Sequence, residues 1–545
     1  MPRPAWNLLP VAAAALASLV AAPGARGQLA ESNVLVVYDS RIPDSLLVAE
    51  HYAGSAKVPG GSGLAPGRRP GVRVVDLAAL PGGGMSPPAT DISYPDFISR
   101  FRNPLRAHLT AQGISESVRC LVLTKGLPHR VMDHDNFFIG DNPSGMGGEF
   151  TSGDASAASL DIELALLWQN LDQGEVGGFA DSRADGMIVN PYARQTLPVH
   201  AWPSASIRTA KSFIAVPGWT GGIWQTAGGG ATRLTPGDMY LVTRLDGHTV
   251  AHVSAMIDRA ALPAIPVDAE SAAIVLDESL ANGVADAGEN GELDNQGPPA
   301  LRAGDDFELT RDRLLADGRM LPANLRYDQS AGAANFLVGP LLGFDGEGMV
   351  LAAPVVLLGH EGNNHAGPKP GDGPGPDPSA GSLFAESFNY APGAIFNTIE
   401  SYNCRAFGGL GTIIGQEQAA DFLAAGGTFA LGNVWEPFSI SIPDNSALIS
   451  NFLLGRLTWA EAAYTALPAL SWQQVVLGDP LARVVLSRHD LTLDQAVGAA
   501  DLYRWHEQPA AGDLNRSGLA DDADRRLLEA AVRGHEAVFL ASGQR

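Results

Sequence analysis

A chain of 545 residues is too long to fold around one hydrophobic core, so its length predicts two or more domains. Hydrophobic residues make up 45% of the chain and charged residues 17%, which argues for a folded globular protein and against a disordered one. The net charge of −23 and the lack of any stripe of Lys and Arg argue against nucleic-acid binding.

The first 27 residues have the pattern of a secretory signal peptide. Arg3 provides a positive charge, and residues 8–22 form an apolar segment that is too short to span a bilayer. Small residues follow at Ala25 and Gly27, so we expect cleavage before Gln28. No later segment has the roughly 20 apolar residues of a membrane helix. We therefore expect an exported protein without a membrane span, which is secreted, periplasmic or held at the cell surface.

Residues 28–235 are expected to form an N-terminal α/β subdomain. Three apolar runs are continuous rather than alternating, as in buried parallel strands. These runs cover residues 33–38, 72–77 and 118–123. Helical patterns separate them at 44–52 and 94–112, and a further helix is expected at 159–171 within a loop-rich insertion. The order of strand, helix, strand, helix, strand predicts a doubly wound, mostly parallel sheet.

The loop-rich insertion begins with several residues of the types that bind metals. They are His129, Asp133, His134, Asp135 and Asp141. Their spacing matches no known pattern of metal ligands, so we interpret them as part of a solvated loop.

Residues 236–487 are expected to form a second α/β subdomain. Its expected strands cover residues 239–246, 272–277, 350–358, 394–399, 429–434 and 472–480. Its expected helices cover residues 249–262, 307–315, 416–425 and 447–466. The two subdomains could form two sheets side by side or one large sheet with an insertion.

Two of these apolar runs lead to residues that are able to do chemistry. The first leads to His360 and the second, at 394–399, is followed shortly by Cys404. In an open α/β sheet, reactive groups gather at the carboxyl ends of parallel strands. A cysteine peptidase needs a thiolate, an imidazole that generates it and later protonates the leaving amine, and donors for the oxyanion. The pair therefore predicts Cys404 as nucleophile and His360 as its catalytic partner, acting on a peptide or protein substrate.

The chain has only two cysteines, Cys120 and Cys404. In an exported protein, two cysteines can form a single disulfide. However, Cys120 lies inside an apolar run that reads as a core strand, so either cysteine could instead be free.

The second half of the chain resembles the caspase-like cysteine peptidases, which include caspases, legumains, clostripain and gingipains. The His-ended and Cys-ended strands carry this resemblance, and residues 418–432 and 477–481 are similar to the gingipain type in particular. Residues 37–45, 123–128 and 472–480 also resemble a family of exported bacterial proteins without a known activity. The resemblance implies a caspase-like fold of two α/β subdomains with catalytic residues His360 and Cys404.

One residue departs from the caspase-like pattern. Those enzymes place Gly directly after the catalytic His, whereas this chain has Glu361 there and Gly362 next. A carboxylate beside a developing oxyanion is unfavourable. His365 is a second candidate base. The alternative to a peptidase is a non-catalytic secreted or cell-surface scaffold or binding protein on the same fold.

The C-terminal segment, residues 488–545, contains a loop with the spacing of an EF-hand calcium site. Oxygen donors at loop positions 1, 3, 5, 9 and 12, the carbonyl at position 7 and Gly518 at position 6 suit Ca²⁺. The corresponding ligands are Asp513, Asn515, Ser517, Leu519, Asp521 and Asp524. The loop resembles that of dockerin modules, which implies a small all-α module, with helices at 493–507 and 524–532, and a protein partner. The alternative is a metal-free loop that caps a helix.

Overall fold

The structure, a computed structural model, describes most of the chain. The described residues are 29–132, 158–169, 188–204, 206–214, 224–225, 233–269, 271–277, 307–317, 319–328, 337–340, 349–360, 384–408, 418–435, 437, 442–486, 489–492, 497–508, 514 and 519–541. The expected signal peptide, residues 1–27, lies outside them. The same is true of Glu361, His365 and the expected calcium ligands Asp513, Asn515 and Ser517.

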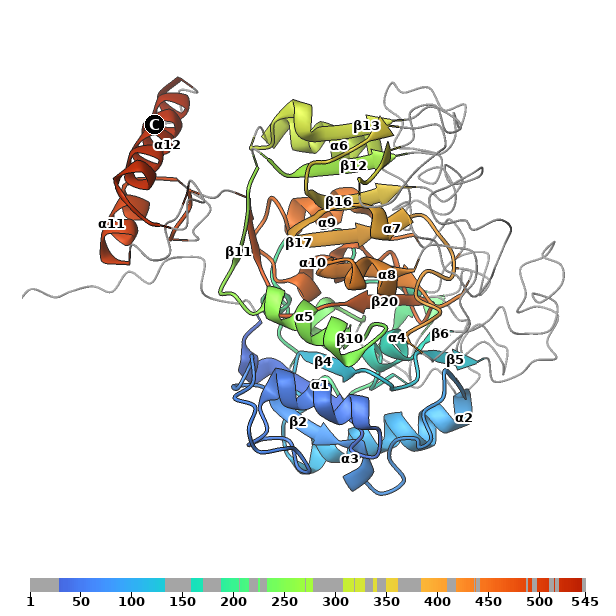
Figure 1. Ribbon diagram of the computed structural model, residues 1–545. Coiled ribbons are helices and arrows are strands. Elements are labelled where there is room, and N and C mark those ends of the chain that lie inside the picture. The colour runs from blue at the N-terminus through green and yellow to red at the C-terminus, as the bar shows by residue number, and fades with distance from the viewer. Residues whose placement is uncertain are drawn as a thin grey trace, which may run out of the picture.

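A single ten-stranded sheet runs through the main body (Figure 1), which confirms the expected α/β class with a mostly parallel sheet. The strand order is β13-β12-β16-β17-β18-β20-β10-β4-β1-β2. The strands are β1 (Val34–Tyr38), β2 (Arg73–Asp76), β4 (Cys120–Thr124), β10 (Leu241–Leu245), β12 (Ala273–Asp277), β13 (Leu325–Asp328), β16 (Val355–His360), β17 (Tyr390–Asn397), β18 (Phe429–Asn433) and β20 (Gln474–Leu477). β18 and β20 pair antiparallel, and β20 meets β10 at the pair Arg244–Leu477.

The two halves of the chain thus share one sheet. The boundary expected at 235/236 falls between β4 and β10, which are neighbours with Val242 opposite Leu121. Every residue of β1, β4, β10, β12, β16, β18 and β20 is buried. Continuous apolar runs are typical of strands covered on both faces.

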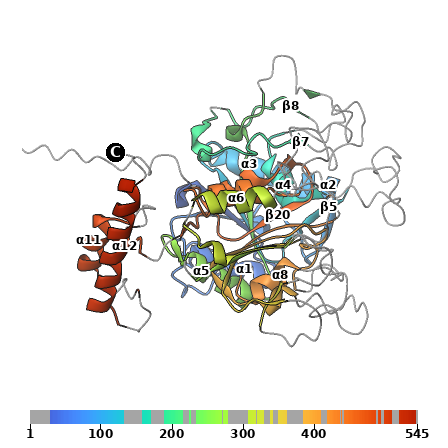
Figure 2. The same cartoon turned by 90° about the horizontal axis from the view of Figure 1, so that it is seen from above.

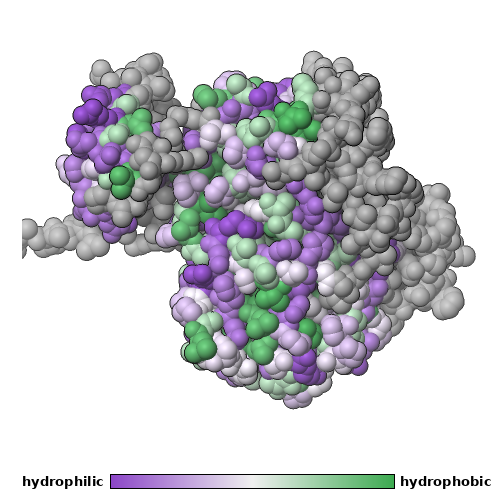
Figure 3. Space-filling view, viewed as in Figure 1, coloured by the Kyte–Doolittle hydropathy of each residue, from purple (hydrophilic) through white to green (hydrophobic). Residues whose placement is uncertain are grey.

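Helices cover both faces of the sheet (Figures 1 and 2). One layer contains α1 (Pro43–Ala53), α5 (Val250–Ala260), α7 (Phe384–Ser387) and α8 (Ala419–Ala424). The other contains α3 (Asn103–Ala111), α4 (Leu160–Ala165), α6 (Phe307–Asp317), α9 (Asn445–Asn451) and α10 (Trp459–Ala466). Among the described residues, no helix is both long and apolar enough to cross a membrane. Polar and apolar side chains are intermixed over the described surface of the face in Figure 3.

Some expected elements differ from the structure in their bounds or are divided in two. The helix expected at 447–466 is two helices, α9 and α10, because Thr458 and Glu461 form a capping box that starts α10 afresh. The strand expected at 350–358 begins only after Pro354, which has no amide hydrogen to donate. The helix expected at 94–112 starts with the short α2 (Tyr94–Asp96) and a π-helical turn, Phe97–Arg102, before α3.

Short strands form smaller sheets around the main one. β3 (Asp91–Ser93), β5 (Arg130–Met132) and β6 (Ala158–Ser159) form one of them. The others pair β11 (Ile265–Val267) with β21 (Val484–Leu486), β14 (Leu337–Val338) with β15 (Met349–Val350), β7 (Ile188–Val189) with β19 (Ala469–Leu470), and β8 (Phe213–Ile214) with β9 (Trp224–Gln225).

The C-terminal residues form a separate helical pair, α11 (Ala499–Glu507) and α12 (Asp522–Ala541), beside the main body (Figures 1 and 2). The two helices contact each other and enclose their own small core. This core consists of Val497, Trp505, Leu514, Leu528 and Val532. The module therefore has a hydrophobic core of its own.

Candidate functional site

His360 ends strand β16, and Cys404 lies in the segment that follows the neighbouring strand β17. His360 is the last residue of β16, and β17 is the next strand. The amide of Ile399 donates a hydrogen bond to the carbonyl of His360 (2.9 Å), so the chain leaving β17 runs alongside His360. The chain then turns back over β18, where the Cys404 amide donates to the carbonyl of Asn433 (2.9 Å).

Both cysteines are free and fully buried, so the disulfide alternative is wrong. Cys404 Sγ lies against Gly432 of β18. A Cβ atom at position 432 would overlap both Cys404 Sγ and Asn403 Oδ1. Burial raises the pKa of the Cys404 thiol, the charge of Asp161 raises it further, and Arg244 opposes the shift. In this arrangement Cys404 is a neutral thiol, which is a poor nucleophile.

Several hydrogen bonds fix the backbone around Cys404. Asn403 Oδ1 accepts from the amide of Asn433 (2.6 Å), and the carbonyl of Asn403 accepts from the amide of Ala419 at the start of α8 (2.8 Å). Tyr402 has a φ of 61°, in the left-handed region that non-glycine residues seldom adopt. Gln418 Nε2 donates to the carbonyl of Tyr402 (3.1 Å). β18 and α8 thus hold residues 402–404 in a strained turn.

His129 is a neighbour of this turn that the sequence did not single out as a site residue. It is completely buried, so its interpretation as part of a solvated loop is wrong; Asp133, His134, Asp135 and Asp141 lie outside the described residues. Its Nε2 donates to the carbonyl of Arg405 (2.8 Å), and its ring meets Phe407 edge-on at 5.1 Å between centroids. Burial, followed by the charge of Arg244, lowers the pKa of His129 to about 3. The ring is therefore neutral, with the proton on Nε2.

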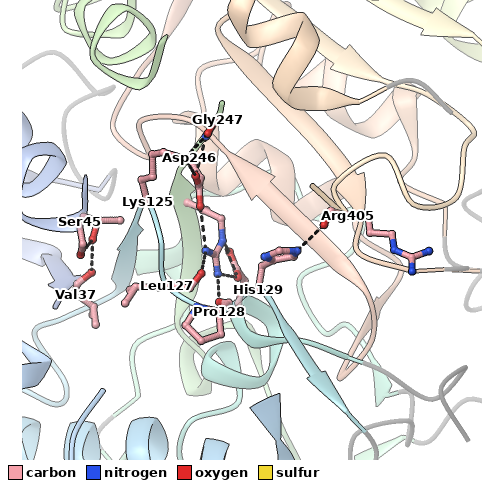
Figure 4. A network of polar contacts seen from close by, with 12 residues as sticks. Val37, Ser45, Lys125, Leu127, Pro128, His129, Asp246, Gly247 and Arg405 are labelled. Atoms are coloured by element: carbon pink, nitrogen blue, oxygen red, sulfur yellow. Dashed lines mark hydrogen bonds and ion pairs between the residues drawn. The ribbon is translucent and has the colours of Figure 1, made fainter. Parts of the chain in front are cut away.

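A buried ionic network fixes the chain that leads to His129 (Figure 4). The Arg244 and Asp161 side chains are both fully buried and form an ion pair of 2.7 Å. Arg244 also donates to the carbonyls of Leu127 (3.0 Å) and Pro128 (2.7 Å). These bonds position the backbone directly before His129, whose ring extends towards the carbonyl of Arg405 (Figure 4).

The network continues to the end of β4 through a second ion pair. Lys125 Nζ lies 3.3 Å from Asp246 Oδ1 and donates to the carbonyl of Gly247 (2.6 Å). Asp246 Oδ2 in turn lies 3.5 Å from Arg244. Two cations and two anions thus balance one another inside the fold, as buried charges require.

The described part of the expected calcium loop caps α12. Asp521 Oδ1 accepts from the amide of Ala523 (2.8 Å), and Asp524 Oδ2 accepts from the amide of Asp521 (2.8 Å). Leu519 is exposed. Within the described part of the chain, no three His, Cys, Asp or Glu side chains are grouped so that they could hold a metal ion. The described contacts are those of a helix N-terminus.

Comparison with known proteins finds no matching family model, no similar curated protein and no similar solved structure.

Proposed function

We propose that this chain is an exported, caspase-like cysteine peptidase that acts on peptide or protein substrates through Cys404 and His360. The observation that carries the proposal is the hydrogen bond from the Ile399 amide to the His360 carbonyl, because it ties the segment leading to Cys404 to the strand end that carries His360. Adjacent parallel strands that both lead to reactive side chains are a common arrangement in α/β enzymes.

In this mechanism the Cys404 thiolate attacks the scissile carbonyl carbon, and the C–N bond of the resulting tetrahedral intermediate breaks. His360 accepts the thiol proton and gives it to the leaving amine, and water then hydrolyses the thioester. Because burial raises the pKa of the Cys404 thiol, the reaction requires that the turn carrying Cys404 moves to admit substrate.

A second candidate function is a non-catalytic secreted or cell-surface scaffold or binding protein on the same fold. The complete burial of Cys404 favours it, since a catalytic thiol has to reach its substrate. Cys404 would then be a core residue like Cys120.

Alkylation of the native protein with iodoacetamide distinguishes the two functions, with Cys120 as an internal control. Cys120 is also fully buried, and burial raises the pKa of its thiol too. For a peptidase we expect mass spectrometry to find Cys404 modified and Cys120 intact, and His360→Gln to slow peptide cleavage by about 100-fold or more. If both cysteines react only on unfolding, Cys404 is not a nucleophile and the scaffold function holds.

We also propose that the loop at 513–524 binds Ca²⁺ and orders the C-terminal module, which then binds a protein partner. The regular spacing of oxygen-bearing residues and the position of Asp521 and Asp524 at the start of α12 support this.

We expect Ca²⁺ to protect the amides of α12 from hydrogen exchange in the full-length protein. At a free Ca²⁺ concentration 100 times the dissociation constant, Ca²⁺ binding would stabilise the module by about 2.7 kcal/mol. Asp513→Ala should abolish the effect, whereas Asp258→Ala, on the distant helix α5, should not. Equal exchange with Ca²⁺ and with chelator would show that the loop is a metal-free helix cap.

A further inference from the structure

Trp435 lies just beyond the end of β18 and is surrounded by cationic and aromatic side chains. The guanidinium carbon of Arg130 lies 4.1 Å from the centre of its ring, and that of Arg405 lies 4.3 Å from it. The ring of Tyr402 meets it edge-on at 5.0 Å. Two guanidinium groups this close to one ring make cation–π contacts, but they also gather positive charge in one place.

Two hydrogen-bond donors in this group have no acceptor among the described residues. Trp435 Nε1 and Arg130 Nη1 are buried, and no residue of the described chain accepts a hydrogen bond from either atom. Both side chains are more than nine-tenths buried, with exposed fractions of 4% for Trp435 and 6% for Arg130. Leaving a buried donor unsatisfied destabilises the folded protein, and more so when the group is charged. Such donors are therefore rare in folded proteins unless they bind something.

The remaining donors of Arg130 are directed to one partner. Its Nε and Nη2 donate to the carboxylate of Asp91, and the Nη2–Oδ2 distance is 2.6 Å. Asp91 thus neutralises Arg130 and fixes its orientation, while Nη1 is left to bind another acceptor. Arg405 adds a further positive charge on the same ring.

We propose that Arg130, Trp435 and Arg405 form a binding site for a carboxylate group. A carboxylate has two oxygens that can accept hydrogen bonds from Arg130 Nη1 and Trp435 Nε1, and its negative charge suits Arg405. The carboxylate is either the C-terminus of a peptide or an acidic side chain. The site is independent of the proposed catalysis, although Arg405 directly follows Cys404, so a bound peptide would lie beside that turn.

Tryptophan fluorescence titrations of the full-length protein test this proposal with three short peptides. The first has a free C-terminal carboxylate and no acidic side chain, the second is acetylated and amidated with a central aspartate, and the third is acetylated, amidated and uncharged. We expect either the first or the second to bind, which identifies the source of the carboxylate, and the uncharged peptide not to bind.

Two substitutions should weaken this binding. Trp435→Phe keeps the aromatic face but removes the Nε1 donor, and Arg405→Gln removes the charge; each should raise the dissociation constant by about 10-fold or more. Arg130 stays native in both, so its pair with Asp91 is preserved, and thermal unfolding confirms that each variant is folded. Arg100→Gln, a surface arginine paired with Asp96, is the matched control and should bind as the wild type does.

The proposal is overturned if neither carboxylate peptide binds more tightly than the uncharged one. It is also overturned if both folded variants bind the peptides as well as the wild type. Repeating the titrations with Cys404→Ala separates binding from catalysis, because this variant should bind normally whether or not the protein is a peptidase.

Discussion

Replacement of Arg244 by methionine is expected to destabilise the folded protein by about 3–5 kcal/mol. Asp161 is fully buried and would lose its ion-pair partner, and the carbonyls of Leu127 and Pro128 would each lose a donor. An unpaired buried charge is far more costly than a lost surface pair. The midpoint of urea unfolding, followed by tryptophan fluorescence, measures the change.

The pair of Arg100 with Asp96 provides the control, since both of its side chains are well exposed. Arg100→Gln should cost no more than about 1 kcal/mol. Arg244→Met combined with Asp161→Leu should recover part of the lost stability, because no unpaired charge then remains at position 161. If Arg244→Met were no more destabilising than Arg100→Gln, the buried network would not support the fold.

Acid is expected to destabilise the wild type more than a His129→Gln variant. The pKa of His129 is lowered to about 3 in the folded protein, against roughly 6.5 in an unfolded chain. Between these two values the unfolded state binds one more proton, so stability falls as the pH falls, by about 1.4 kcal/mol per pH unit. The urea unfolding midpoint of the wild type should therefore approach that of the variant, or fall below it, as the pH is lowered from 7.5 to 6 and 5.

His506→Gln is a suitable control, because it also removes an imidazole, but from a side chain that is exposed on α11. The stability of the His506→Gln variant should follow that of the wild type at each pH. Parallel curves for the wild type and His129→Gln would contradict the burial of a neutral His129.

The central strands could be predicted from the sequence because strands covered on both faces leave uninterrupted apolar runs. β13 was missed for the opposite reason: at the edge of the sheet, Leu325–Asp328 contains both Arg326 and Asp328, and none of its residues is buried. The split between α9 and α10 was missed because the intervening residues 452–454 are also apolar and continue the helical pattern.

The site was predictable only in part. Local patterns place His360 at the end of an apolar strand and Cys404 in the segment after the next one. The burial of Cys404 against Gly432, and the contact of His129 with Arg405 across 276 residues of sequence, depend on tertiary packing that no local pattern encodes. Likewise, no local pattern shows that Trp435 Nε1 and Arg130 Nη1 lie close together without an acceptor among the described residues.

The position of β20 has a consequence for the synthesis of the chain. Residues 474–477 come late in the sequence, yet they form a strand in the interior of the sheet, between β18 and β10. Until they emerge, β18 and β10 each present an open edge of backbone amides and carbonyls, and such edges promote aggregation. A chain that stops before residue 474 would contain nine of the ten strands and still be unable to close the sheet. The folding step that joins the two halves therefore has to wait until residues 474–477 have been made.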